Sequence, residues 1–311
     1  MKVISFVLPV MNEAQNIPLM KDAIEKAISS LEVQAEIIFV CDPSNDGTEV
    51  VIKDLVSKFS NVKALFLADR AGQTEAMRAG YEHASGEAVI TMDSDFQDPP
   101  ELLPDMIACW AAGSLIVHTH RANRKSDKWI YRNLMGVGYK ILNWATDGRV
   151  KKHVGDFRLI DRSILPLVLS FKDPHPFWRG ITALSGVPNS TLSYTRPERK
   201  FGDTKYSYTI GSPAIAFRGI ASFSNKPLEF LQGIGFASVL LGFASVLYIL
   251  VANILTPSFP RGIPTLIMLL SFFFAVQFVS TAVIATYLIV LVEQTRRRHN
   301  YILLPTNESQ A

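Results

Sequence analysis

The chain has 311 residues, of which 48% are hydrophobic, and a formal net charge of +3 at pH 7. This mild charge argues against a nucleic-acid-binding protein, in which a clustered excess of basic residues is expected. A mean hydropathy of +0.19 is unusual for a soluble protein, so part of the chain is expected to sit in a membrane. The length allows one large domain with an appendage, or two small domains.

Residues 1–120 alternate short β-rich runs with helical stretches. The predicted elements, in chain order, are strand Val3–Leu8, helix Ile17–Leu31, strand Glu36–Val40, helix Glu49–Phe59, strand Val62–Leu67, helix Gln73–Ala84, strand Ala88–Met92, a helix near Glu101–Ala112 and strand Leu115–Thr119. This alternation predicts an α/β domain with a parallel sheet and helices on both faces. Ligands of such sheets bind at the carboxyl ends of the strands.

Polar residues follow each of the first four predicted strands. The four clusters are Pro9–Glu13, Asp42–Thr48, Asp69–Gln73 and Asp93–Pro100. Any one of them could be an ordinary turn or helix cap, but four at one edge of a sheet indicate a ligand site. The chain lacks a G-x-G-x-x-G motif after the first strand and lacks a P-loop, which argues against a dinucleotide site and an NTPase.

The fourth cluster is the most acidic. Asp93 and Asp95 leave the same strand end, with Gln97 and Asp98 directly behind them. Oxygen ligands clustered in this way suit a hard cation such as Mg²⁺ or Mn²⁺. Such a cation would bridge a diphosphate and neutralise charge on a departing group. The alternative is a solvated acidic turn that caps the helix beginning near Glu101.

Two long apolar stretches lie in the C-terminal third of the chain. Neither Phe230–Leu255 nor Gly262–Val292 contains a charged residue, and a membrane-spanning helix needs about 20 apolar residues. We therefore predict two transmembrane helices, with a pair of buried core helices as the alternative. Basic residues flank the pair, among them Lys226 before it and Arg296 after it. The positive-inside rule then places the large N-terminal part and both termini in the cytoplasm, on the inner (plasma) membrane.

Two basic segments lie between the α/β region and the apolar stretches. Residues 121–132 carry five basic side chains and lead into an amphipathic helix with tryptophans nearby, a pattern typical of helices that lie on a membrane surface. An ordinary surface helix is the alternative. Residues 196–207 form a second basic stretch with Gly and Pro, which is either a loop that closes over a ligand or a linker to the membrane.

Four segments together resemble family 2 glycosyltransferases, and more narrowly the polyprenyl-phosphate glycosyltransferases such as the bactoprenol glucosyltransferases. These segments are Leu8–Glu13, Asp42–Thr48, Asp93–Glu101 and Gly155–Leu159. The resemblance covers roughly residues 1–225. It implies a GT-A-type, Rossmann-like α/β fold with a mostly parallel sheet and helices on both faces, followed by two C-terminal transmembrane helices. The expected domains are a cytosolic catalytic domain at 1–205, a juxtamembrane helical region at 206–228, two spans within 229–292 and a cytosolic tail at 293–311.

The resemblance also implies roles for residues that match the family's motifs. The residues implied in nucleotide-sugar binding are Pro9, Asn12, Glu13, Asp42, Arg70, Asp93, Arg199 and Lys205. The implied metal ligands are Asp93, Asp95 and Gln97, the implied catalytic residues are Asp95 and Asp156, and the implied lipid-phosphate ligands are Arg121 and Arg132. For Asp156 the alternative is a structural carboxylate that pairs with Arg158. The chain departs from the family in having Arg70-Ala71-Gly72 where Arg-Asn-x-Gly is common, which puts the geometry of that loop in question.

The implied activity is inverting transfer of a hexose to a polyprenyl (undecaprenyl) phosphate, dependent on Mg²⁺ or Mn²⁺. Glucose from UDP-glucose is the first choice, while mannose, N-acetylglucosamine and an aminoarabinose derivative stay open as the sugar. A processive polysaccharide synthase is an alternative, although that chemistry usually comes with more spans and a Gln-x-x-Arg-Trp motif. The intact acidic clusters argue against a non-catalytic membrane scaffold. Small residues in the spans permit close helix packing, and hence a homo-oligomer.

Overall fold

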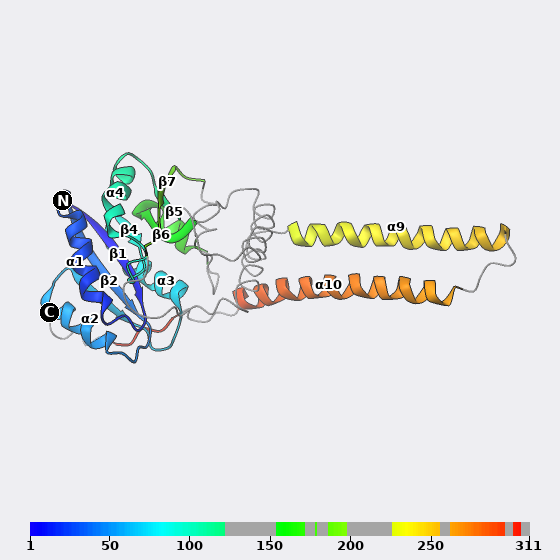
Figure 1. The fold of residues 1–311 in the computed structure, drawn as a ribbon, viewed down its shortest axis with the longest axis horizontal. Helices are drawn as coiled ribbons and strands as arrows, with labels where there is room; N and C mark the ends of the chain where they lie inside the picture. The colour runs from blue at the N-terminus through cyan, green and yellow to red at the C-terminus, as the bar shows by residue number, and fades with distance from the viewer. Residues whose placement is uncertain are drawn as a thin grey trace. The chain divides into compact units, whose positions relative to one another are not determined.

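The structure is a computed structural model that describes residues 1–121, 154–171, 178, 186–197, 226–255, 262–295 and 301–305 (Figure 1). Its elements are β1 Lys2–Val10, α1 Asn16–Ile28, β2 Val33–Cys41, α2 Thr48–Lys58, β3 Val62–Phe66, α3 Gln73–His83, β4 Ala88–Thr91, η1 Pro100–Leu102, α4 Leu103–Ala111, β5 Ile116–Arg121, β6 Val154–Asp161, η2 Arg162–Ile164, α6 Leu165–Leu169, β7 Asn189–Tyr194, α9 Lys226–Leu255 and α10 Ile263–Thr295. All nine elements predicted before residue 120 are present, with ends that differ by at most three residues.

The described strands form one seven-stranded sheet in the order β3-β2-β1-β4-β6-β5-β7. Strands β1 to β4 are parallel to one another, and β7 is parallel to β5. Strand β6 lies between β4 and β5 and is antiparallel to both. The prediction of a mostly parallel sheet is therefore confirmed. The segment Gly155–Leu159, known from the sequence only as a motif, lies within the antiparallel strand.

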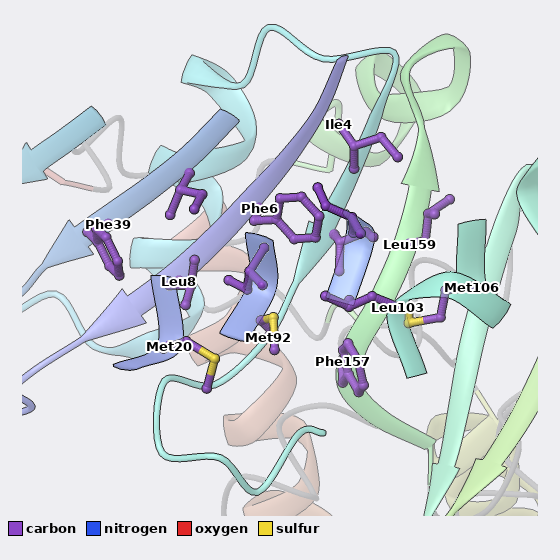
Figure 2. Close-up of a cluster of buried hydrophobic side chains, with 14 of the residues drawn as sticks. Ile4, Phe6, Leu8, Met20, Phe39, Met92, Leu103, Met106, Phe157 and Leu159 are labelled. Carbon is purple, nitrogen blue, oxygen red and sulfur yellow. The ribbon is translucent and has the colours of Figure 1, made fainter. Parts of the chain in front are cut away.

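The larger core lies on the face of the sheet that α1, α2 and α4 cover. Alternate residues of β1, namely Ile4, Phe6 and Leu8, are fully buried there, because successive side chains of a strand point to opposite faces. Figure 2 shows them in one cluster with Leu103 and Met106 of α4. Burying apolar surface stabilises a fold by roughly 25 cal/mol per Å², so this layer fixes the position of the strands whose ends carry the polar clusters.

The opposite face of the sheet is covered by α3, which packs closely on β1 and β2. A Cβ atom at Gly80 of α3 would lie 2.2 Å from Cγ1 of Val7 in β1. Only glycine permits this approach without moving the helix. Helices thus lie on both faces of the sheet, as predicted. The close packing of α3 on β1 also fixes the position of Gln73, the first residue of α3, which follows the loop after β3.

Helices α9 and α10 belong to a second compact unit and contact each other. They contain 30 and 33 residues. Within the described part of the chain, one helical window, Phe272–Ile289 of α10, is long and apolar enough to cross a membrane. A transmembrane role for α9, and the predicted boundaries of the four domains, stay predictions.

Candidate active site

The candidate site lies at the carboxyl ends of β1 to β4. Because these four strands are parallel, the loops that follow them leave the same edge of the sheet. Hydrogen bonds join each of the four polar clusters to a neighbouring cluster. The sequence prediction that the clusters meet at one edge is confirmed.

The loops after β1 and β2 are tied together by Asn12 and Glu13. The Asn12 side-chain oxygen accepts from the backbone N–H of Asn45 at 2.9 Å, and the backbone N–H of Asn12 donates to Ser44 Oγ at 3.0 Å. The Glu13 N–H donates to Thr48 Oγ1 at 2.9 Å. Asn12 adopts a φ of 52°, a left-handed conformation that asparagine tolerates better than most residues. Asn12 and Glu13, both predicted to bind the nucleotide-sugar, therefore connect the loops after β1 and β2. Pro9, the third predicted residue here, lies within β1.

Asp42 organises the loop that follows β3. Its Oδ1 accepts from the N–H of Ala71 and its Oδ2 from the N–H of Gly72, each at 3.1 Å. Burial raises the pKa of the Asp42 carboxyl, while these two hydrogen bonds and the charge of Arg70 oppose the rise. Gly72 has φ 84° and ψ 167°, a combination that is essentially restricted to glycine. The loop thus keeps a defined geometry despite its departure from the family pattern.

Arg70 is exposed at the middle of this loop, between β3 and α3. Its neighbours Ala71 and Gly72 are held by the buried carboxylate of Asp42. The loop therefore presents the Arg70 guanidinium at the sheet edge, and the backbone next to Arg70 is held in place. This arrangement is compatible with the predicted contact of Arg70 with a nucleotide-sugar.

The loop after β4, Asp93–Pro100, is here called the acidic loop, because it carries Asp93, Asp95 and Asp98. Asp95 and Asp98 expose only 6% and 1% of their surface. Asp93 Oδ1 accepts from Gln73 Nε2 at 2.8 Å, and the Asp93 N–H donates to Asp98 Oδ2 at 3.0 Å. Burial and the negative charges of Asp98, Asp95 and Asp156 raise the pKa of Asp93. This excess of negative charge is the kind that a bound cation relieves.

The predicted metal ligands fit a divalent cation by chemistry and proximity in the chain. Asp95 Oδ1 accepts from the Gln97 N–H at 3.0 Å, and Phe96 between them has a left-handed φ of 63°. The described residues contain no group of three or more His, Cys, Asp or Glu side chains placed to hold a metal. Mg²⁺ commonly takes one or two carboxylates and completes its shell with substrate phosphates and water, so two aspartates and an amide oxygen suffice as protein ligands.

Arg121, a predicted lipid-phosphate ligand, is joined to the acidic loop through Tyr194. The Arg121 Nε–H donates to the Tyr194 hydroxyl at 3.1 Å, and that hydroxyl donates to Asp98 Oδ1 at 2.8 Å. The Arg121 Nη2 also lies 3.7 Å from the same carboxylate oxygen. A Cβ at position 155 would stand 3.2 Å from Arg121 Nε, so Gly155 leaves room for the guanidinium.

Asp156 forms a 2.7 Å ion pair with Arg158, which is fully buried. The Asp156 side chain is 23% exposed, and its negative charge acts on Asp93 of the acidic loop. The pairing that was the alternative interpretation of Asp156 is present. Its predicted catalytic role stays a prediction.

Sequence reasoning missed two residues at the end of β7. Tyr194 carries the bridge just described, and Arg196 places Nη2 3.9 Å from Asp93 Oδ2. Asp98 was noted in the acidic run but given no role of its own. A basic stretch from Arg196 onward was visible in the sequence, yet nothing local predicted a strand at 189–194. Of the other predicted residues, Arg132, Arg199 and Lys205 lie outside the described residues.

Comparison with known proteins identifies the family. The model of glycosyl transferase family 2 matches residues 5–167. A prophage bactoprenol glucosyl transferase homolog of Escherichia coli K12 is 31% identical over 96% of this chain and 98% of its own length. The bactoprenol glucosyl transferase of Shigella phage SfV is 30% identical over 99% of both chains.

Among solved structures, glucosyl-3-phosphoglycerate synthase from Mycobacterium tuberculosis, in complex with Mn²⁺, UDP and phosphoglyceric acid, shares the fold. It matches with a TM-score of 0.51 and 19% identity, over 71% of this chain and 77% of that chain. This likeness supports the GT-A-type arrangement of the sheet. By the extent of the family match and the identity of its relatives, the chain belongs to glycosyl transferase family 2 and is a glycosyltransferase.

Proposed function

We propose that the protein transfers glucose from UDP-glucose to a polyprenyl phosphate such as undecaprenyl phosphate, with inversion at the anomeric carbon. The observation that carries the proposal is the hydrogen-bonded chain from Asp93 through Asp98 and Tyr194 to Arg121. It joins a carboxylate cluster suited to a metal-bound diphosphate with a cation suited to an acceptor phosphate. The names of the relatives from Escherichia coli and Shigella phage SfV point to glucose and bactoprenol.

In the proposed reaction an oxygen of the lipid phosphate attacks the anomeric carbon of the sugar. A new carbon–oxygen bond forms to the lipid phosphate, and the bond from the anomeric carbon to the UDP oxygen breaks with its electron pair. Asp93, Asp95 and Gln97 would hold Mg²⁺ or Mn²⁺, which when bound supplies positive charge to the departing diphosphate. Arg121 would bind the acceptor phosphate in the orientation set by Tyr194 and Asp98.

A strong general base is not required, because a phosphate monoester is already anionic at neutral pH. Asp156 is paired with the buried guanidinium of Arg158 at 2.7 Å, and this contact holds its carboxylate in one orientation. We therefore assign Asp156 an orienting role next to the acceptor rather than a proton-accepting one. Arg70 and Arg196 supply further positive charge on the donor side of the sheet edge.

We further propose that α9 and α10 both cross the inner membrane and keep the glycosyltransferase domain and both termini in the cytoplasm. Large apolar side chains on both helices are exposed in the protein: Phe236 by 71% and Phe278 by 73%. Core helices of a soluble protein would bury such side chains. The basic residues at the flanks support this topology by the positive-inside rule.

The proposal is tested by incubating the purified full-length protein with radiolabelled nucleotide-sugars, undecaprenyl phosphate and Mg²⁺ or Mn²⁺. UDP-glucose should yield a chloroform-soluble glycolipid faster than GDP-mannose, UDP-N-acetylglucosamine or a UDP-aminoarabinose derivative. A faster rate with another donor would change the assigned sugar but keep the chemistry. A water-insoluble polymer in place of the glycolipid would instead indicate a processive synthase.

A further inference from the structure

Residues Tyr301–Pro305, here called the C-terminal segment, pair with the exit of strand β3. The Leu304 N–H donates to the Phe66 carbonyl at 2.8 Å, and the Ala68 N–H donates to the Ile302 carbonyl at 2.8 Å. Leu303 and Leu67 are antiparallel bridge partners. Because β3 is at the edge of the sheet, the C-terminal segment extends the sheet by a short stretch beyond it.

The same segment also contacts helix α3. The Tyr301 hydroxyl donates to Glu82 Oε2, in the last turn of α3. Burial and the adjacent carboxylate of Glu82 raise the pKa of Tyr301, so the hydroxyl keeps the proton that it donates. The C-terminal segment therefore attaches to both elements that the loop of residues 67–72 connects.

That loop is also held at its far end. The amides of Ala71 and Gly72 donate to Asp42, and the residue after them, Gln73, donates to Asp93 of the acidic loop. Between the two attachments, Asp69 and Arg70 are exposed. The position of Arg70 relative to Asp42 is thus fixed from one side by Asp42 itself and from the other by the C-terminal segment.

Hydrophobic burial contributes little to this attachment. Ile302 and Leu304 expose 58% and 46% of their surface, and only Tyr301 and Leu303 are partly buried. Main-chain hydrogen bonds and the Tyr301 phenol therefore contribute much of the attachment. Main-chain hydrogen bonds are directional, and they set the geometry of the β3 exit more than they add stability. Protection of an edge strand, the alternative role, predicts an effect on stability without an effect on ligand affinity.

We propose that the C-terminal segment is a positioning element for the nucleotide donor. By pairing with Phe66–Ala68, it holds the loop that presents Arg70 and that Asp42 anchors. This inference rests on the proposed donor role of that loop. It assigns a function in the reaction to residues that follow the apolar helices in the chain and lie far in sequence from every other site residue.

The direct test compares Leu304→Pro with Leu304→Ala in the full-length protein. Proline removes the N–H that donates to Phe66, while alanine keeps it and serves as the matched control. A proline at position 304 restricts Leu303 to extended backbone, and Leu303 already pairs with Leu67 as an antiparallel bridge partner, so the proline variant mainly deletes one hydrogen bond. The probe is UDP with Mn²⁺, and the readout is its dissociation constant by titration calorimetry.

We expect Leu304→Pro to bind UDP about five-fold more weakly, the effect of losing one ordinary hydrogen bond, and Leu304→Ala to bind like the wild type. The KM for undecaprenyl phosphate should be unchanged in both variants. Tyr301→Phe, which removes only the contact to Glu82, should weaken UDP binding in the same direction and decides the matter if the proline variant does not fold.

UDP affinity equal to that of the wild type in Leu304→Pro and Tyr301→Phe, with or without a lower melting temperature, would overturn the inference and leave edge protection as the role of the segment. A wild-type protein that binds no UDP would contradict the proposed function instead. The two failures are therefore distinguishable in one set of titrations.

Discussion

Substitution of Glu36 by glutamine should destabilise the domain strongly, because this carboxylate is the polar centre that joins β2 to its neighbours. Glu36 is 5% exposed. It accepts hydrogen bonds from the Ser5 hydroxyl of β1, from the Ser85 N–H and hydroxyl at 2.8 and 2.6 Å, and from Lys63 Nζ of β3 at 2.7 Å. A glutamine amide nitrogen cannot accept any of these bonds.

The magnitude follows from the pKa of the group. Burial alone would raise the pKa of Glu36, but the bonds from Lys63, Ser5 and Ser85 outweigh it and lower the pKa from 4.5 to about 2. At 1.36 kcal/mol per pKa unit, this difference corresponds to about 3 kcal/mol in the free energy of unfolding. Because the folded pKa is depressed, the contribution is fully present above pH 4.5 and is lost as the pH falls toward 2.

The assay is thermal unfolding of the full-length protein in detergent, followed by tryptophan fluorescence. A loss of about 3 kcal/mol should lower the melting temperature of Glu36→Gln by roughly 6–12 °C at pH 7, for a domain of this size. The variant should also lose less stability than the wild type between pH 5 and pH 3. The control is Glu32→Gln, which changes an exposed carboxylate directly before β2. This variant should melt like the wild type. A Glu36→Gln protein that melts within 1 °C of the wild type would refute the reasoning.

Two further substitutions test the candidate site. Tyr194→Phe removes the hydroxyl between Asp98 and Arg121. Initial rates should show a KM for undecaprenyl phosphate raised about 3- to 10-fold, with little change in UDP affinity. An unchanged KM would contradict the proposed positioning of Arg121. Asp42→Asn places an amide NH2 group opposite the N–H of Ala71 or Gly72. Calorimetry should show UDP affinity reduced by about five-fold or more. Affinity equal to that of the wild type would mean that the loop after β3 does not depend on Asp42.

Local sequence patterns predicted the parallel half of the sheet well. The runs around Phe6, Ile38 and Ile90 are fully buried β-strand centres, and each is followed by Asn, Asp or Gly residues that break the strand. Since parallel strands end at one edge, the joining of their polar clusters followed from the fold class. The acidic loop at Asp93 and Asp95 is for this reason predictable from the sequence.

Features that depend on distant pairing were not predictable in the same way. Strand β6 inserts antiparallel between β4 and β5, and no local pattern specifies which neighbours a strand selects. Tyr194 becomes a site residue only because β7 pairs with β5 and brings its hydroxyl to Asp98. The pairing of Leu303 with Leu67 joins residues at opposite ends of the chain and leaves no signature in either segment.

The central claim, metal-assisted transfer of glucose to a lipid phosphate by the acidic loop, is tested most directly by a single comparison of wild type with Asp95→Asn. Both purified full-length proteins are given radiolabelled UDP-glucose, undecaprenyl phosphate and Mn²⁺, and chloroform-soluble label is counted with and without a chelator. The account predicts glucolipid from the wild type that the chelator abolishes, and a loss of at least about 100-fold in the variant, the scale found when a key electrostatic contact is removed. Full transfer by Asp95→Asn with the metal chelated would contradict it.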